Sequence, residues 1–582
     1  MLSPYLALAG ILPVALAAVN GACPPLGPVL PAPTNPSSHE AVQSAVASFE
    51  DAFKQNITAA LNATGISVAL QSIHEESPIL ELHHTPAYLN PNGTHEIDAN
   101  SVYRLGSISK IFAVLSVLKL CDVKFDDPVT KYVPELRLLR GETSEADDIT
   151  AVQWDQVTIG SLASHMSGIG TDLVADLATV MSGVPGSWTE LGLPELNKTL
   201  LPNCAGVLGL PSCNRAQFFR DFGKRHPVYA PFTTPVYSNA ASSILSFVVE
   251  AAVSDNSTYA GFVQSEIFAP LGMTNTTIHS GPEQDAWGFI PLGETWWGGS
   301  LGYEDAAGGF YSNTADLLRF GAGILKHEIL DGAATRKWMK PVASTSSSGL
   351  AMGAPWEILR STTATADGRL VEFYCKAGNL NTYNNMLCLI PDYDLVLTIL
   401  SGGAESNNRL VDGTLSAVVK ALLPAVEAAG RSQAATLIAG TYGDDATNSS
   451  VTLSVDEAGP GFEVSEWIVR GVDVIANYAG YGALSSSPTK DVTVNVRLYP
   501  TNLESGSRTA WRAVFDVGTP EEIAEYEDAM FWPNAGCATW GKMDRFVYQF
   551  RSIDEFAIET DEDGKGSAIT LHGFQVDLKK KA

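Results

Sequence analysis

The pattern of apolar residues changes near residues 429–432, and this change limits the folds that the chain can adopt. Before it, helical periodicity dominates residues 107–330, and strand-like apolar segments follow at 354–400. After it come β-branched or alternating segments, separated by turns rich in Gly, Asp and Ser: 451–455, 492–496 and 568–571. The sequence therefore predicts an α/β module, with an antiparallel sheet flanked by helices, followed by an all-β module.

The length of 582 residues also favours more than one domain. A lipocalin-like barrel is one form that the all-β module can take, and this module shows no catalytic constellation. Within the α/β module we expect helices at 39–65 and 407–428 and strands at 66–70 and 101–104. We divide the whole chain into a signal peptide at 1–18, a Pro-rich segment at 19–37, the α/β module at 38–430 and the all-β module at 431–582.

The N-terminus predicts export from the cell. An apolar run that ends at Ala18 is too short to span a membrane and resembles a secretory signal, cleaved after Ala17, Ala18 or Ala22. No other stretch is long and apolar enough to span a membrane. Seven N-x-Ser/Thr sequons add glycosylation to the prediction: Asn56, Asn62, Asn92, Asn197, Asn256, Asn275 and Asn448.

The seven cysteines cannot all pair within the chain, because their number is odd. Cys204 and Cys213 bracket a loop that contains Pro and Gly, so a disulfide between them could staple it. Cys121 follows an apolar helical segment, and we expect a buried free thiol there.

The charge of the chain excludes some classes of partner. The net charge is −28 and the pI about 4.7, which argues against nucleic acid and anionic membranes. Lys579–Lys581 is the only basic run and reads as a solvated tail. The pair His83-His84 lacks the context of a metal site, and no phosphate or dinucleotide loop is present. No metal or organic cofactor is therefore expected, and the oligomeric state stays open.

Ser107 and Lys110 carry the clearest chemical signal. If a helix starts at Gly106, residues i and i+3 share one face, and the lysine amine can take the proton of the serine hydroxyl. Two other Ser-x-x-Lys copies are less suited to this chemistry. Ser116 would face the opposite side of the same helix, and Ser487 precedes a proline in a Ser-rich loop.

Two further motifs follow in the order that such a site needs. Tyr237 and Asn239 precede a helical pattern and offer a phenol that relays protons and an amide that binds substrate. Lys376 and Gly378 form a Lys-x-Gly motif on a predicted strand. Each motif alone is more often a turn or an ordinary strand, but the ordered set of three favours a catalytic site.

The chain resembles the serine β-lactamase and penicillin-binding-protein superfamily, nearest its class C β-lactamase, D-aminopeptidase and esterase branch. It is also similar to fungal secreted β-lactamase-like proteins with an extra C-terminal domain. The resemblance covers roughly residues 38–428 and implies a β-lactamase/transpeptidase-like fold. Besides the three motifs, these segments carry it: 124–135, 158–168, 268–273, 307–312 and 376–391.

The resemblance implies that Ser107 attacks a carbonyl and that Lys110 and Tyr237 move its proton. Lys376 would act electrostatically on Tyr237 or contact the substrate. Asn239 would form a hydrogen bond to the acyl side of the substrate. The N–H groups of Ser107 and Asn379, beside Gly378, would form an oxyanion hole.

This reading makes the chain a secreted serine hydrolase or acyltransferase, of esterase, peptidase or transacylase type. Small-molecule or peptide esters and amides would be its substrates. A biosynthetic acyl-transfer enzyme and a catalytically silent binding protein remain as alternatives. Relatives active on penicillins usually carry Thr or Ser where this chain has Ala377, so we expect weak activity on β-lactams.

Two further expectations concern neighbouring segments. The stretch Gly298–Gly302 matches G-x-S-x-G, but the residues around Ser300 fit neither the strand nor the helix that a nucleophile elbow requires. We interpret it as a loop near the cleft. If a hairpin turns at Asn381-Thr382, Cys375 and Cys388 lie opposite each other on one face, and we predict a disulfide between them.

Overall fold

The computed structural model describes most of the chain. The predicted signal peptide and cleavage sites, Asn256 and Ser487 lie outside the described residues. These are 23–139, 147–171, 177–181, 188–195, 197–204, 210–253, 257–279, 282–294, 296–457, 459–481 and 493–581.

The α/β module is built on an eight-stranded sheet with the order β2-β1-β10-β9-β8-β7-β6-β5, and every neighbouring pair is antiparallel. This confirms the predicted antiparallel sheet. The strands are β1 Thr64–Ser72, β2 Leu80–His84, β5 Ala343–Ser344, β6 Leu350–Met352, β7 Glu357–Ser361, β8 Val371–Leu380, β9 Tyr383–Ile390 and β10 Leu395–Gly403.

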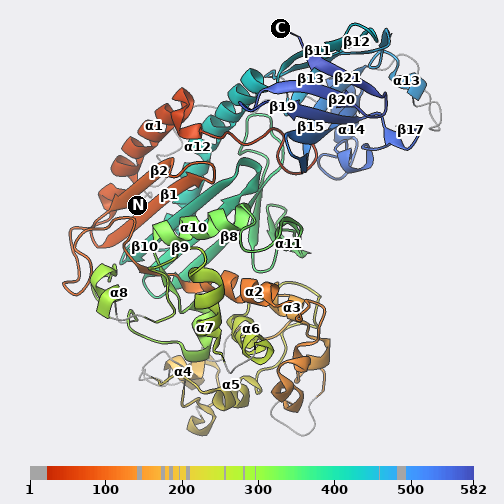
Figure 1. The fold of residues 1–582 in the computed structure, drawn as a ribbon. Coiled ribbons are helices and arrows are strands. Elements are labelled where there is room, and N and C mark those ends of the chain that lie inside the picture. Colours follow the sequence, from red (N-terminus) through yellow and green to blue (C-terminus); the bar gives the residue numbers. More distant parts are fainter. Residues whose placement is uncertain are drawn as a thin grey trace.

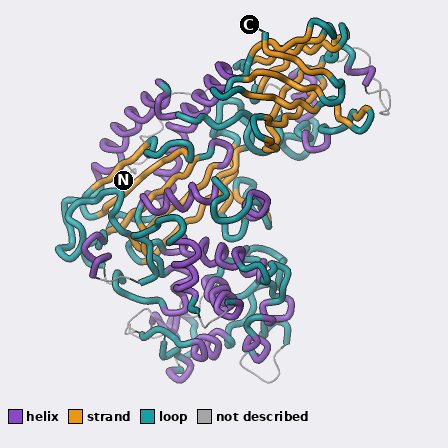
Figure 2. Tube along the Cα trace, in the orientation of Figure 1, coloured by secondary structure: helices purple, strands orange, loops and turns teal. Residues whose placement is uncertain are grey.

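Helices cover both faces of this sheet, as Figures 1 and 2 show. On one face, α1 (Glu40–Asn56) and α12 (Asn408–Leu437) pack against each other. On the other face lies α10 (Thr314–Leu325), next to the helical region that contains α2 (Ser109–Lys119) and α6 (Asn239–Ala252). Apolar cores fill both interfaces, so the residues of β9 and β10 are buried on both sides.

The helical region contains shorter elements that position loops around α2 and α6. Its two-stranded ribbon pairs β3 (Tyr103–Arg104) with β4 (Tyr311–Ser312), so the segment before Ser107 is anchored to a distant part of the chain. The remaining helices of the α/β module are α3 Ile159–Ala163, α4 Leu177–Met181, α5 Arg215–Phe222, α7 Tyr259–Val263, α8 Pro282–Trp287, α9 Asp305–Gly308 and α11 Gly332–Trp338.

Helix α12 is longer than the sequence suggested. We predicted a helix at 407–428, whereas α12 continues to Leu437 and crosses the change in composition. Its first part packs on the sheet of the α/β module through residues such as Leu415 and Val418. Its last part contacts the core of the all-β module through Ala434. A single helix therefore joins both modules (Figure 1).

The all-β module is a closed antiparallel barrel, because β12 pairs with both β11 and β13. The prediction of an all-β module with barrel form is confirmed. Aromatic side chains, among them Trp467, Trp511 and Phe556, fill its interior. The module contains β11 Gly440–Asp444, β12 Ser449–Ser454, β13 Phe462–Val469, β14 Val472–Asp473, α13 Tyr478–Tyr481, β15 Val494–Ser505, β16 Arg508–Val517, α14 Pro520–Asp528, β17 Val547–Tyr548, β18 Arg551–Ser552, β19 Glu555–Thr560, β20 Gly566–Leu571 and β21 Val576–Lys580.

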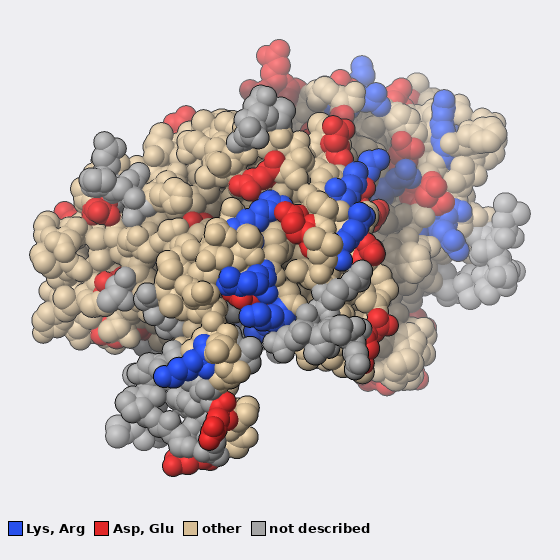
Figure 3. Space-filling view, turned by 90° about the horizontal axis from the view of Figure 1, so that it is seen from below, with Lys and Arg blue, Asp and Glu red and all other residues tan. Residues whose placement is uncertain are grey.

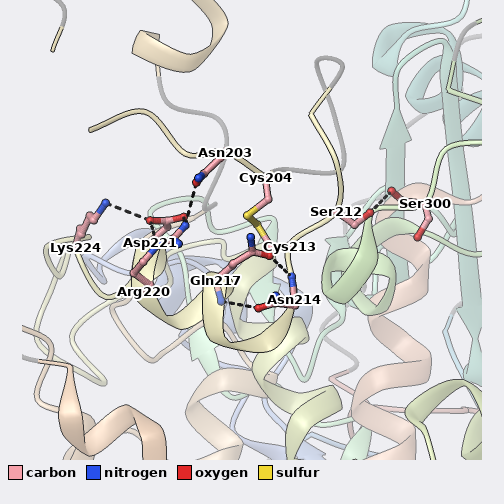
Figure 4. The surroundings of a disulfide bond; sticks show 10 residues. All are labelled: Asn203, Cys204, Ser212, Cys213, Asn214, Gln217, Arg220, Asp221, Lys224 and Ser300. Atoms are coloured by element: carbon pink, nitrogen blue, oxygen red, sulfur yellow. Dashed lines mark hydrogen bonds and ion pairs between the residues drawn. A yellow bond between two sulfur atoms is a disulfide. The ribbon is translucent and has the colours of Figure 1, made fainter. Parts of the chain in front are cut away.

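Three disulfides connect cysteines of the described residues. Both predicted pairs are present: Cys204–Cys213, whose surroundings Figure 4 shows, and Cys375–Cys388 on facing positions of β8 and β9. The third joins Cys23 to Cys537 in the all-β module, a pair that the sequence analysis missed.

Cys121 is free, as predicted, but the expectation that it is buried was wrong. Helix α2 ends at Lys119, so Cys121 lies in the turn beyond the helix and is exposed to solvent.

The surface carries charges of both signs. In the view from below, Lys and Arg side chains lie close to Asp and Glu side chains, and most of the visible surface is uncharged (Figure 3). Ion pairs of the helical region include Arg215 with Glu135 and Asp221 with both Arg220 and Lys224. The acidity of the chain is therefore not gathered into one continuous patch on this face.

Phe112 provides a test of the helical core behind α2. Its side chain is fully buried, and the rings of Phe268, Phe310 and Phe320 lie 5.3, 5.1 and 4.5 Å from it. We expect Phe112→Ala to lower the free energy of unfolding by about 3–5 kcal/mol, because it leaves a cavity. Leu138→Ala, at a position that is 79% exposed, should change it by less than about 0.5 kcal/mol. Denaturant unfolding compares the two variants, and equal losses would contradict this core.

Candidate active site

Two glycines allow the segment of Ser107 to lie directly against strand β8. Gly106 has a φ of +58°, and a Cβ atom added to it would lie 2.6 Å from the backbone nitrogen of Asn379. A Cβ on Gly378 would lie 2.0 Å from the carbonyl oxygen of Leu105. Only residues without side chains permit such an approach. Residues Gly106–Ile108 form a 3₁₀ turn that leads into α2, so the predicted helix begins with this turn.

Asn385, which the sequence analysis missed, holds this turn from the sheet side. Its buried side-chain amide donates hydrogen bonds to the carbonyl oxygens of Arg104 (2.8 Å) and Leu105 (3.3 Å). Its side-chain oxygen accepts one from the N–H of Ser401 (3.1 Å). The sheet therefore fixes the backbone just before Ser107. Nothing in the local sequence around Asn385 indicates this role.

Lys110 lies beside Ser107, as the spacing predicted. Its amine is fully buried and donates to Ser107 Oγ (3.0 Å), to Asn239 Oδ1 (2.6 Å) and to the carbonyl oxygen of Ala307 (2.7 Å). The Ala307 carbonyl oxygen, in α9, and Asn239 Oδ1 can only accept, so they fix two of the three directions around the nitrogen. The direction toward Ser107 is then the one that can hold either a proton or the lone pair that takes a proton from the serine.

Tyr237 is the second group in contact with the Ser107 hydroxyl. Its hydroxyl donates a hydrogen bond of 2.6 Å to Ser107 Oγ. The amines of Lys110 and Lys376 lie 4.9 and 5.3 Å from the centre of its ring. Burial raises the pKa of Tyr237, but the two lysine charges lower it further, and the net result is a pKa below the usual 10. The hydroxyl of Tyr237 therefore loses its proton more easily than that of an ordinary tyrosine.

His165, which belongs to the 158–168 segment, supports Tyr237 from behind. The two ring centres lie 4.6 Å apart with their planes tilted by 34°, and His165 Nδ1 accepts a hydrogen bond from the backbone N–H of Ser238 (3.2 Å). Burial, followed by the charges of Lys110 and Lys376, holds the pKa of His165 well below 6.5, so the ring stays neutral. Its backbone φ of 61° is unusual for a residue with a side chain.

Lys376 completes the cluster and is held by Glu357, a second residue that the sequence analysis missed. The Lys376 amine donates to Glu357 Oε1, and the N–H of Ala377 donates to Glu357 Oε2 (2.9 Å). Burial lowers the pKa of Lys376, but the Glu357 charge outweighs it, and the net pKa is raised. Lys376 therefore keeps its charge at neutral pH. Glu357 lies on β7, and no motif marks it.

The structure brings the predicted catalytic residues together and separates the decoys from them. Ser116 is buried and donates to the carbonyl oxygen of Phe112. Ser300 donates to Asp305 Oδ2 (3.0 Å), and the described residues just before it, 296–299, form no strand. Trp297, just before it, is buried and packs against Tyr311. The G-x-S-x-G segment is thus a loop without the partners of a nucleophile.

Among the described residues, the sequons agree with surface positions. Asn275 is partly exposed. The other described sequon asparagines are exposed: Asn56, Asn62, Asn92, Asn197 and Asn448.

Comparison with known proteins shows the family to which the chain belongs. The family model described as "Beta-lactamase" matches residues 53–420, and one described as "Beta-lactamase-like-like, C-terminal domain" matches residues 430–582. A "Beta-lactamase-like protein" of Arthroderma benhamiae is 30% identical, with 97% of this chain and 95% of that protein covered. A "Probable hydrolase clz13" of Cochliobolus lunatus is 25% identical, with coverages of 96% and 91%. A solved "class C beta-lactamase" is 16% identical, covers 66% of this chain and 97% of its own, and gives a TM-score of 0.46.

The influence of Lys376 on Tyr237 can be measured directly. Lys376→Gln removes a positive charge but keeps a donor for Glu357, so the pKa of Tyr237 should rise. Ultraviolet difference titration against the same protein with Tyr237→Phe isolates this tyrosine. Its ionisation should move to higher pH in Lys376→Gln and stay in place in Lys326→Gln, a change at an exposed lysine. A shift to lower pH would contradict the arrangement.

Proposed function

Because the chain belongs to the β-lactamase family, we propose that it is a serine hydrolase or acyltransferase that works through an acyl-enzyme on Ser107. One observation carries the proposal. The hydroxyl of Ser107 lies within hydrogen-bond distance of both a buried lysine amine and a tyrosine hydroxyl whose pKa is lowered. A serine needs such a neighbouring base to become a nucleophile. The intact set of groups disfavours a catalytically silent binding protein.

The first half of the reaction forms the acyl-enzyme. Ser107 Oγ bonds to the carbonyl carbon of the substrate while its proton passes to Lys110, with Tyr237 sharing this acid–base work. The N–H groups of Ser107 and Asn379 stabilise the negative charge that develops on the carbonyl oxygen. When the bond to the leaving alcohol or amine breaks, Tyr237 or Lys110 returns the proton to it.

The second half releases the acyl group. Water, or another alcohol or amine, attacks the acyl carbon and loses a proton to the same base. The Ser107 Oγ–carbon bond then breaks, and the base returns this proton to Ser107 Oγ, which restores the free hydroxyl. Lys376 keeps the pKa of Tyr237 low throughout, and Asn239 binds the acyl side of the substrate. Whether water or a larger acceptor attacks distinguishes a hydrolase from an acyltransferase of a biosynthetic reaction.

We place this activity outside the cell. Three disulfides favour an oxidising compartment, and none of the described helices is long and apolar enough to cross a membrane. The predicted signal peptide and the sequons agree with export and glycosylation. In this proposal the barrel supports the end of α12 and takes no part in the chemistry.

The nucleophile can be tested with an uncharged fluorophosphonate probe. Labelling should fall on Ser107 and disappear in Ser107→Ala, because the hydroxyl of Ser107 lies beside both the Lys110 amine and the Tyr237 hydroxyl. Ser116→Ala and Ser300→Ala are the controls and should be labelled like the wild type. Mass spectrometry of the labelled peptide locates the adduct. Labelling that persists in Ser107→Ala would overturn the mechanism.

The substrate preference follows from Ala377, which has no side-chain donor for a carboxylate. Losing a hydrogen bond to a charged group costs about 1.5–3 kcal/mol, or roughly ten- to hundredfold in rate. We expect kcat/KM for penicillins to be low compared with uncharged esters. Ala377→Thr should raise the ratio of penicillin to ester hydrolysis. Penicillin hydrolysis by the wild type at the level of dedicated β-lactamases would show that another group binds the carboxylate.

A further inference from the structure

A cavity of about 320 Å³ lies between α12 and the strands β6–β9. Its size is within the range of small-molecule sites. Successive side chains of β8 alternate between the two faces of the sheet, so Cys375, Ala377 and Asn379 face this cavity. Lys376 belongs to the opposite face, where its amine lies 5.3 Å from the centre of the Tyr237 ring, and the backbone of Gly378 lies against Leu105 and Ile108. The cavity is thus separate from the catalytic cluster but shares strand β8 with it.

Asn379 connects the cavity with the nucleophile. Its backbone lies against Gly106, next to Ser107, and its side chain donates to Asn408 at the start of α12. Both asparagines line the cavity. Asn379 therefore contacts the segment of Ser107 through its backbone and also lines the cavity, so the cavity and the nucleophile are neighbours across one residue.

The lining of the cavity combines an apolar wall with negative charge. Glu357 and Asp412 are its charged residues, and no Lys or Arg is among the lining residues. Arg409 follows Asn408 on α12 but does not line the cavity. Leu350, Leu359, Met386, Val411 and Leu415 supply the apolar wall.

Glu357 also occupies the groups that would attract an anion. Its two carboxylate oxygens accept hydrogen bonds from the Lys376 amine and the Ala377 N–H. A substrate carboxylate would have to displace Glu357 from both donors and would then lie beside a like charge. An uncharged or cationic group meets no such obstacle.

We propose that this cavity is a substrate subsite for an apolar group without negative charge, and that Glu357 makes it reject carboxylates. The assignment of the occupant to a substrate rests on the proposed function of Ser107. Together with Ala377, Glu357 would explain a preference for uncharged esters and amides over β-lactams.

Binding to the full chain carrying Ser107→Ala tests the subsite without catalysis. The probes are 4-phenylbutanamide, 4-phenylbutylamine and 4-phenylbutanoate, which share an apolar part and differ in charge. By calorimetry we expect the amide and the amine to bind about tenfold or more tightly than the carboxylate. Equal or tighter binding of the carboxylate, or no binding of the amide and amine at millimolar concentration, would overturn the proposal.

Two matched pairs of variants locate the effect. Ser416→Trp adds a bulky side chain at an exposed position of the cavity wall and should weaken the binding of 4-phenylbutanamide about tenfold. Ala435→Trp, exposed on the same helix away from the cavity, should not. Glu357→Gln should raise the affinity for the carboxylate probe about tenfold relative to that for the amide probe. Glu328→Gln, at an exposed site, should leave the ratio of the two affinities unchanged. Unchanged binding in Ser416→Trp or an unchanged ratio in Glu357→Gln would refute the subsite.

The outcome is separable from that of the proposed function. If the probes bind as expected but Ser107 is not labelled by the fluorophosphonate, the subsite stands and the serine mechanism fails. If Ser107 is labelled but the charge preference is absent, the mechanism stands and the role of Glu357 fails.

Discussion

Two buried lysine amines that lie close to one tyrosine ring set the requirements for this site. Lys110 and Lys376 are almost completely removed from solvent, and an unpaired buried charge costs several kcal/mol. Each amine therefore needs acceptors with fixed positions. Ala307 and Asn239 supply them to Lys110, and Glu357 supplies one to Lys376. The site can form only where α2, α6, α9 and two strands meet.

This requirement explains the close backbone packing around the nucleophile. The amines must reach the same tyrosine from a helix and from a strand, so the turn at Gly106 and strand β8 lie in direct contact. Two glycines permit the contact, and Asn385 secures it from the sheet. The disulfide Cys375–Cys388 ties β8 to β9 on the face away from Lys376. The reacting groups are thus held by regular secondary structure rather than by flexible loops, which favours precise geometry.

Strand β8 carries different functional groups on its two faces. One face presents Lys376 to Tyr237, and the other presents Ala377 and Asn379 to the acidic, apolar cavity beside α12. Glu357 couples the two faces, because it holds the Lys376 charge and also lines the cavity. In the proposed enzyme the same carboxylate would therefore support catalysis and select the substrate. The barrel packs around the last part of α12 (Figure 1).

The sequence alone determined the features that depend on local spacing. The i, i+3 relation of Ser107 and Lys110, the facing cysteines of the β8–β9 hairpin and the change to an all-β pattern follow from fixed helical and strand periods. Only the tertiary structure decided which distant groups meet. Glu357 and Asn385 reach the site, Cys23 reaches Cys537, and α12 extends into the second module. Such contacts depend on which distant elements pack together, and the spacing of residues along the chain does not show this.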